Sequence, residues 1–513
     1  MTGRQPQVGP SRVELGSVPL FAAFGAEQVR PSRPGRVRSD FSLAGRPSLH
    51  AVTDEDAVAP RRSHEAVHDA EVDWDLAAAL RGQASKLLTS RIADAAPPNE
   101  EARRELGRAV ILEVVADANA HRFDLEGYAW SVEDQQALAK AVYDLMFGLG
   151  RLQPLVDRDD VEDIIAVGHD QVFLNLVDGR KVPGPAIANS DDELVLMLQD
   201  LAARNSPPRA FSEANPSLHL NLDGARLAAN VAVTQAPTLV VRRHRLVRVT
   251  LDDLIGLGTV TPVMASFLAA AVRARMSIVV SGIQGDGKTT MLRALCAEID
   301  PDEVIGLFET ERELGLEKLR DQHHVVFSWE ERPGSGELGP DGKPVNMYTL
   351  QRQMRDSFRM ILSRQIVGEV RGPEVAQMIM AMESGSGSMS TTHSESARQT
   401  MEKLISCAVQ SGEFTVESAA MKLMRCIHLV VHLRTDYGRR ADGTTTKQRV
   451  VDEIIAVRPG EGRSGDAITT VFRPSDGAGP AVPDILPDHL RVLERHGFAA
   501  NQFALEVQRG GLA

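Results

Sequence analysis

The spacing of hydrophobic positions changes several times along the chain, and each change marks a different kind of segment. Between residues 70 and 150, apolar side chains recur every three or four positions, which is the spacing of helices with one buried face. A proline pair ends the first helix, and a second helix is expected at about 101–120. Ser131 and Asp134 form a capping box that begins a third helix. We therefore expect a small helical domain.

Short runs of apolar and β-branched residues replace this spacing between residues 151 and 245. A segment of helical character at 193–203 interrupts them, and Asp223-Gly224 has the composition of a tight hairpin turn. The runs that predict strands are 164–167, 172–174, 218–222, 226–233 and 239–241. Together these segments predict a compact α+β domain.

Strand-like and helix-like segments alternate from residue 246 to about 458, which predicts a largely parallel sheet covered by helices. The fold class is therefore expected to be α/β. The expected organisation is a disordered tail at 1–65, a helical domain at 66–150, an α+β domain at 151–245, a parallel α/β domain at 246–458 and a C-terminal extension at 459–513 with one helix near 487–496.

The composition narrows the classes of function. The 513 residues carry a net charge of −13, which argues against a protein that binds nucleic acid over its whole surface. Seven arginines face three acids within the first fifty residues, so the tail is either a solvated segment or a contact for anionic lipid or nucleic acid. Three widely spaced cysteines indicate no disulfide framework and no cysteine-rich metal site. No apolar run reaches the roughly 18 residues of a membrane span, and no signal peptide is visible, so we expect a cytoplasmic protein without an integral membrane segment.

A phosphate-binding pattern follows the β-rich run at 277–280 and precedes a helix-like segment that starts at Thr290. Glycines let backbone amides curl around phosphates, and the N-terminus of the following helix adds positive potential. In such a loop Lys288 reaches the β- and γ-phosphates of ATP, and the Thr289 hydroxyl ligates Mg²⁺. The predicted cofactors are ATP and Mg²⁺. The residues assigned to nucleotide binding are Gly282, Ile283, Gln284, Gly285, Asp286, Gly287, Lys288, Thr289 and Thr290.

Asp286 is an unusual member of this loop. Its carboxylate has the same sign of charge as the phosphates that the loop is predicted to bind. Either the side chain points outward, or the acid signals weakened nucleotide affinity.

A second acid is needed beside the metal, and the β-rich run at 365–369 ends in Glu369. This carboxylate is placed either to polarise the attacking water or to hold Mg²⁺ through water. A glutamate at a strand end is usually a surface residue, but a position about 80 residues after a phosphate loop favours the catalytic role. The flanking Arg359, Arg364 and Arg371 are interpreted as surface or ion-pair residues unless they act in catalysis or at a subunit interface.

Several further segments share their pattern with one known family. Residues 366–372 (IVGEVRG) match a Walker B signature, 387–393 (GSMSTTH) a His box, and 308–314 (FETEREL) an acidic box. Segments of an N-terminal α+β domain are matched at 148–155, 161–168, 223–227 and 239–243. On these residues the chain resembles the type II/type IV secretion and pilus-assembly ATPases, and within them the CpaF-like Tad/Flp branch. The resemblance runs from about residue 70 to about 500 and implies that 246–458 form a RecA-like P-loop ATPase domain.

The resemblance also implies roles for individual residues. The acidic-box glutamates would lie near the metal and the water, the Walker B acid would act on both, and the His-box histidine would contact the γ-phosphate region. Three arginines of the α+β domain would close over the nucleotide and neutralise charge on the transferred phosphoryl group. The acidic-box glutamates are Glu309 and Glu313, the Walker B acid is Glu369, and the His-box histidine is His393. The three arginines are Arg226, Arg242 and Arg243.

The family also implies an assembly and a task. Its members are ring-shaped homo-hexamers in which domain closure converts ATP binding into a stroke. Pilus assembly or protein secretion is then driven through an inner-membrane platform protein, so the chain would associate peripherally with the inner face of the membrane. The chain departs from the family pattern at Asp286, Thr310, Leu362-Ser363 and Ser386, so slow or partner-dependent turnover is compatible with the site. A nucleic-acid-handling RecA-like motor and a nucleotide-binding scaffold with little or no turnover remain as alternatives.

Overall fold

The computed structural model divides into two compact units, Met1–Pro154 and Leu155–Ala513. It describes residues 72–510 apart from 206–208, 223, 244–247, 333, 335–337, 341, 343, 440–444, 460–465 and 478. The tail expected at 1–65 and residue Asp223 of the expected hairpin turn lie outside the described residues. No helix in the described part of the chain is long and apolar enough to cross a membrane.

In the described part of the first unit, three helices pack around an apolar core. They are α1 (Trp74–Asp94), α2 (Glu100–Glu126) and α3 (Val132–Phe147), followed by the 3-10 turn η3 (Gly150–Leu152). The capping box that Ser131 and Asp134 predict is present, with both reciprocal hydrogen bonds. Helix α2 continues past the expected end near residue 120 and stops at Gly127, whose φ of 78° suits glycine. Leu80, Leu88, Val110 and Val142 are among the buried core residues.

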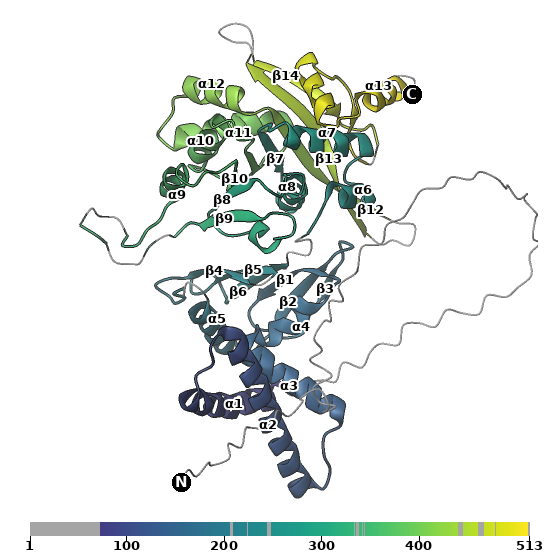
Figure 1. The fold of residues 1–513 in the computed structure, drawn as a ribbon. Helices are drawn as coiled ribbons and strands as arrows, with labels where there is room; N and C mark the ends of the chain where they lie inside the picture. The colour runs from purple at the N-terminus through teal and green to yellow at the C-terminus, as the bar shows by residue number, and fades with distance from the viewer. Residues whose placement is uncertain are drawn as a thin grey trace, which may run out of the picture. The chain divides into compact units, whose positions relative to one another are not determined.

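The second unit begins within the short helix α4 (Gln153–Asp157) and continues into a six-stranded antiparallel sheet. In spatial order its strands are β3 (Lys181–Pro183), β2 (Gln171–Leu176), β1 (Val161–Val167), β6 (Thr238–Arg243), β5 (Ala225–Asn230) and β4 (Ser217–Leu222). Helix α5 (Asp191–Arg204) lies along one face of this sheet (Figure 1) and buries Leu194, Leu198 and Leu201. Because strand residues alternate between faces, the side chains between the buried ones point to the other face.

A nine-stranded sheet forms the rest of the second unit. Its spatial order is β15 (Val482–Pro483), β14 (Asp466–Arg473), β13 (Thr445–Pro459), β12 (Leu429–Arg439), β7 (Ile278–Gly282), β11 (Met389–His393), β10 (Arg364–Val370), β8 (Val304–Glu309) and β9 (Val325–Glu330). Strands β12 to β9 in this order are parallel, whereas β13 to β15 are antiparallel. The predicted α/β fold with a largely parallel sheet is thus confirmed.

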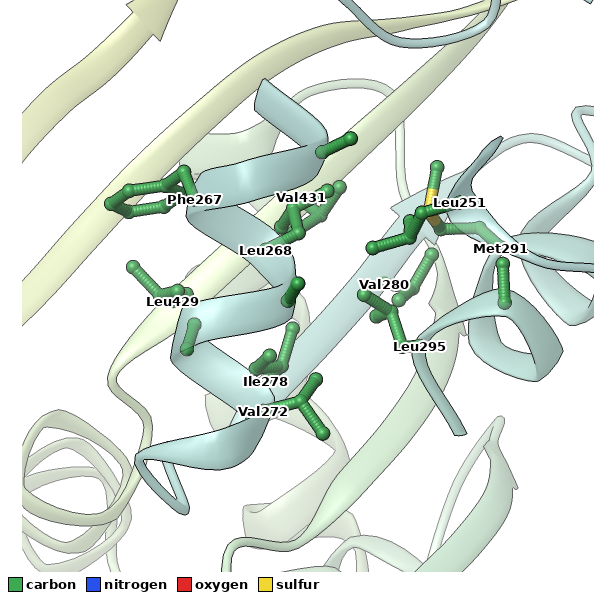
Figure 2. Packing of buried hydrophobic residues seen from close by; sticks show 14 of the residues in the cluster. Leu251, Phe267, Leu268, Val272, Ile278, Val280, Met291, Leu295, Leu429 and Val431 are labelled. Carbon is green, nitrogen blue, oxygen red and sulfur yellow. The ribbon is translucent and has the colours of Figure 1, made fainter. Parts of the chain in front are cut away.

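Helices cover both faces of the parallel strands (Figure 1). They are α6 (Leu251–Gly256), α7 (Pro262–Arg273), α8 (Lys288–Cys296), η4 (Leu316–Lys318), α9 (Leu350–Ser357), α10 (Val375–Glu383), α11 (Ala397–Gln410) and α12 (Val416–Cys426). Ile278 and Val280 of β7 face the core shared with α7 and α8 (Figure 2), whereas Val279 faces the core shared with α10 to α12. A strand buried on both faces is apolar at every position, which explains the continuous apolar run at the start of β7.

The C-terminal extension holds more structure than the single expected helix. That helix is present as the 3-10 segment η5 (Asp488–His496), and α13 (Ala500–Gly510) follows it. Strands β14 and β15 also lie in this region and extend the sheet. Phe472 of β14 and Phe498 pack on Phe267 of α7 at ring-centroid distances of 5.4 and 5.3 Å. The extension therefore contributes to the core around the nine-stranded sheet.

Candidate functional site

Four neighbouring parallel strands bring the candidate site residues to one edge of the sheet. In the order β7-β11-β10-β8, these strands end at or next to Gly282, His393, Glu369 and Glu309. His393 is in register with Gly282 of the adjacent strand. The carboxyl ends of parallel strands are where open α/β sheets bind their ligands, so this edge is the place to look for chemistry.

The phosphate loop connects β7 to α8, and the side chain of Lys288 contacts the backbone of this loop. Lys288 is the first residue of α8, and no side chain caps the start of that helix, as is usual for a helix end that binds an anion. The Lys288 Nζ donates to the carbonyl of Ile283 at 2.9 Å and lies 3.0 Å from His393 Nδ1. Burial lowers the pKa of Lys288 to about 8, although nearby Glu369 acts to raise it. Ile283 and Gln284 are exposed, whereas Thr290 is half-buried in the first turn of α8.

Asp286 turns its carboxylate into the protein. The residue is 2% exposed, and its Oδ2 accepts a hydrogen bond from the amide of Ile283 at 2.7 Å. Its Oδ1 accepts a second one, from the Thr435 hydroxyl of β12 at 2.6 Å. The side chain therefore does not point outward, which was one of the two alternatives that the sequence leaves open, but is buried against these partners.

His393 stands between the lysine of the loop and the acid of β10. Its Nε2 lies 2.9 Å from Glu369 Oε1, and its Nδ1 faces Lys288. A charged lysine can only donate, so Nδ1 accepts and Nε2 carries the proton that is donated to Glu369. Arg371 donates from Nε to the second carboxylate oxygen of Glu369 at 2.8 Å. Burial acts to raise the pKa of Glu369, but the hydrogen bonds from His393 and Arg371 outweigh it and lower the pKa to about 2.

Glu309 is buried with only half of its carboxyl group satisfied. Its Oε1 accepts from the amides of Glu313 and Leu314 at 2.9 and 3.0 Å. Its Oε2 has no hydrogen-bond partner among the described residues. Burial raises the pKa of Glu309 to about 8, and the Leu314 amide opposes this only in part. Gly368 of β10 makes room for the acid, because a Cβ there would lie 2.8 Å from Glu309 Cγ.

Oxygen atoms suited to a hard cation gather around this unfinished carboxyl group. The Thr289 hydroxyl donates to Glu313 Oε2 at 3.1 Å, and both residues line a pocket with Glu309, Glu369 and Arg226. Among the described residues no cluster of three or more acidic, histidine or cysteine side chains is arranged to hold a metal ion. The oxygen atoms that line the pocket nevertheless fit Mg²⁺, because this ion takes one or two protein oxygens and completes its shell with water and phosphate.

The three arginines of the six-stranded sheet have different partners. Arg226 of β5 forms ion pairs with Glu311 and Glu313, and burial lowers its pKa. Arg242 of β6 pairs with Asp163 at 3.0 Å. Arg243 is the next residue of the same strand and therefore points to the other face. It donates to the backbone carbonyls of Arg158 and Val161, the latter at 3.1 Å, and the structure does not bring it to the acids.

Sequence reasoning left several contacts of the site unassigned. Glu311, which pairs with Arg226, lies within the acidic box but receives no role from the sequence. The sequence leaves Arg371 open between a surface or ion-pair residue and a catalytic or interface group. Thr435 and Arg449 contact the phosphate loop from β12 and β13. Nothing in the local sequence marks these two, because they lie 149 and 164 positions from the loop residues that they contact.

Comparison with known proteins identifies related sequences over this region. The family model described as "Type II/IV secretion system protein" matches residues 217–457, from β4 to β13. A Mycobacterium tuberculosis protein whose name assigns it provisionally to conjugal transfer is 28% identical over 328 residues, which span 62% of this chain and 86% of the relative. The type IV secretion system protein PtlH of Bordetella pertussis is 31% identical over 187 residues, 36% of this chain and 52% of its own. The type IV secretion system protein VirB11 of Brucella suis is 25% identical over 335 residues, 59% and 88% of the two chains.

Proposed function

We propose, from the premise that this chain belongs to the type II/type IV secretion ATPase superfamily, that it binds ATP with Mg²⁺ and hydrolyses it. The observation that carries the proposal is the line of contacts from Lys288 through His393 to Glu369. It joins a cation that binds phosphate to an acid that acts on water, at the carboxyl ends of adjacent parallel strands. A scaffold that only held nucleotide would not need the contact between His393 and Glu369.

Each of these residues has a proposed role that follows from its chemistry. Lys288 neutralises the β- and γ-phosphates, and the hydroxyl of Thr289 is offered to Mg²⁺, which when bound adds positive charge beside them. Glu369 has its pKa lowered to about 2, so at neutral pH it is ionised and able to orient an attacking water. His393 accepts from Lys288 and donates to Glu369, and so keeps both groups at fixed positions.

The acids and arginines around the pocket are proposed to respond to the nucleotide. Glu309 and Glu313 offer oxygen atoms toward the pocket beside Thr289. Arg226 is paired with the acidic box, and a triphosphate would compete with those acids for it. We assign Arg226 and Arg242 to closure over the nucleotide. Arg243 is assigned to support of β6, because backbone carbonyls are its partners.

We also propose that hydrolysis drives a protein machine. The names of the relatives refer to conjugal transfer and type IV secretion, and the segments identified in the sequence resemble the Tad/Flp pilus ATPases. A homo-hexamer that docks on an inner-membrane platform protein, and there assembles a pilus or exports a protein, accounts for these similarities. Electron microscopy of the purified chain with and without an ATP analogue tests the ring, and co-purification with the platform protein tests the docking.

Phosphate release by the purified full-length chain tests the enzymatic proposal. Lys288→Ala is expected to lower turnover at least about 100-fold, because a charge that stabilises the transferred phosphoryl group is lost. Lys422→Ala is the matched control, since Lys422 is half-exposed on α12 and pairs with Glu383 outside the site. Equal turnover of the wild type and the Lys288 variant would show that the measured activity comes from elsewhere. Stimulation by DNA or RNA would favour the nucleic-acid motor instead.

A further inference from the structure

A hairpin of the nine-stranded sheet contacts the phosphate loop at two points. Strands β12 and β13 pair antiparallel, and Thr435 lies directly opposite Arg449 in their register. Thr435 donates to Asp286, and Arg449 donates from Nε to the carbonyl of Gly285 at 2.8 Å. One cross-strand pair therefore binds two consecutive residues of the loop.

The Asp286 side chain is the link on the loop side. It accepts from the Ile283 amide at one end of the loop and from Thr435 on the sheet. Both bonds go to a carboxylate, which makes them stronger than bonds between neutral groups. Because Asp286 is only 2% exposed, water competes little for either bond. An acid in a loop for phosphates is explained if its task is to hold the loop to the hairpin.

The loop has a physical need for such an anchor. Asp286 is flanked by Gly285 and Gly287, with φ of 92° and 89°. Glycines of this kind have many accessible conformations, and ordering them around a ligand costs conformational entropy. Arg449 adds a steric limit, because a Cβ on Gly287 would lie 3.2 Å from its Cδ. A loop that is already fixed before the ligand arrives binds more tightly for this reason.

Arg449 also connects the hairpin to the six-stranded sheet. Its guanidinium pairs with Glu162 of β1, which Lys447 of β13 contacts as well at 2.8 Å. Burial acts to raise the pKa of Glu162, but Arg449 and Lys447 outweigh it and hold the pKa below its usual range. The same arginine thus joins the loop, the hairpin and the neighbouring sheet.

We propose that Asp286 is a positioning residue: Thr435 holds the phosphate loop through the Asp286 carboxylate, and Arg449 through the Gly285 carbonyl, in the conformation that receives the triphosphate. This inference rests on the proposed ATP binding. It predicts that the anchor governs nucleotide affinity, while saturated turnover depends on Lys288, His393 and Glu369.

Two variants of Asp286 separate its hydrogen bonds from its charge. Asp286→Asn keeps an acceptor for Ile283 and an amide that can donate to Thr435, but both bonds then join neutral groups, so affinity for a non-hydrolysable ATP analogue with Mg²⁺ should fall, and by less than in Asp286→Ala. Asp286→Ala loses both bonds, so its Kd should rise about tenfold, with a matching rise in KM and a kcat changed by no more than about twofold. Tighter binding by both variants would overturn the proposal in favour of simple charge repulsion. An unchanged Kd in a less stable Asp286→Ala protein would reduce the residue to a structural one and overturn it as well.

Thr435 provides the test from the other side of the contact. Thr435→Val removes the hydroxyl at constant shape and only one of the two bonds to Asp286, so it should raise the Kd by a smaller factor than Asp286→Ala does, whereas Thr435→Ser should keep wild-type binding. In the double variant of Asp286→Ala and Thr435→Val the losses should not add, since one interaction is removed twice. Additive losses, or wild-type binding by Thr435→Val, would overturn the anchor.

Calorimetry on the wild type and Lys288→Ala keeps the two proposals apart. No uptake of the analogue by the wild type would defeat the proposed function. Uptake by the wild type, its loss in Lys288→Ala and no effect of Thr435→Val would defeat only the anchor.

Discussion

Strand β8 carries an acid at each end, and the two acids have opposite surroundings. Glu303 precedes the amino end and binds Arg364 through both carboxylate oxygens at 2.8 and 3.0 Å. Arg275 adds a contact at 2.9 Å. At the carboxyl end, Glu309 has one oxygen bound to two amides and the other without a partner among the described residues. Both acids are largely buried, so burial of charge alone does not mark a functional site.

The completeness of the hydrogen bonding distinguishes the two ends. Arg364 is 1% exposed and also donates to the carbonyls of Val272 and Gly387, so the cluster at the amino end is closed. A closed cluster fixes the fold and has no capacity left for a ligand. An unpaired buried oxygen costs free energy unless a ligand, an ion or water completes it. This contrast supports the proposal that nucleotide and cation bind at the carboxyl end.

The largest expected effect comes from a variant that breaks the closed cluster around Arg364. Arg364→Met removes a buried cation of similar length and leaves Glu303 and two carbonyls short of donors, so the free energy of unfolding should fall by about 3–5 kcal/mol. Arg275→Met is the matched control, because Arg275 binds the same acid with its side chain 45% exposed, and should cost no more than about 1 kcal/mol. Chemical denaturation measures both. A stable Arg364→Met protein that fails to bind nucleotide would reverse the assignment of the two ends.

An effect of intermediate size concerns the unfinished carboxyl group of Glu309. Its pKa is raised from 4.5 to about 8 in the folded chain, so between these values the folded state binds more protons than the unfolded state. Stability of the nucleotide-free protein should therefore fall as pH rises from about 5 to about 8, by at most about 1.4 kcal/mol per pH unit from this group. Glu309→Gln removes a group that titrates in this window and should flatten the profile. An unchanged slope in the variant would assign the pH dependence to other groups.

The smallest expected effect concerns the charge of Lys288. Its pKa is lowered to about 8 in the nucleotide-free chain, and only the protonated amine attracts phosphate. Affinity for an ATP analogue should therefore be constant below this value and fall by roughly tenfold per pH unit above it. Lys288→Arg remains charged throughout and should show a flat profile, even if it binds less well. A wild-type profile that stays flat to pH 10 would mean that the amine keeps its ordinary pKa.

Some parts of the fold were predictable because their causes are local. The capping box of Ser131 and Asp134 lies within one turn of α3. The phosphate loop is readable because spaced glycines, the lysine and the threonine are contiguous between a strand and a helix. In the C-terminal extension, by contrast, local spacing does not predict α13 and β14, because Phe472 of β14 packs on Phe267 of α7 more than 200 positions earlier, and Phe503 of α13 packs in turn on Phe472.

The sequence by itself determined the loop, the class of sheet and the kinds of residue available for chemistry, since backbone preferences and short-range spacing are written in neighbouring residues. Only the tertiary structure decided which of those residues meet. His393 reaches Lys288 across 105 positions because β11 is inserted between β7 and β10. Asp286 turns to Thr435 because β12 pairs with β7. Strand order and side-chain direction come from packing between distant segments, and they convert a list of acids, bases and arginines into one site.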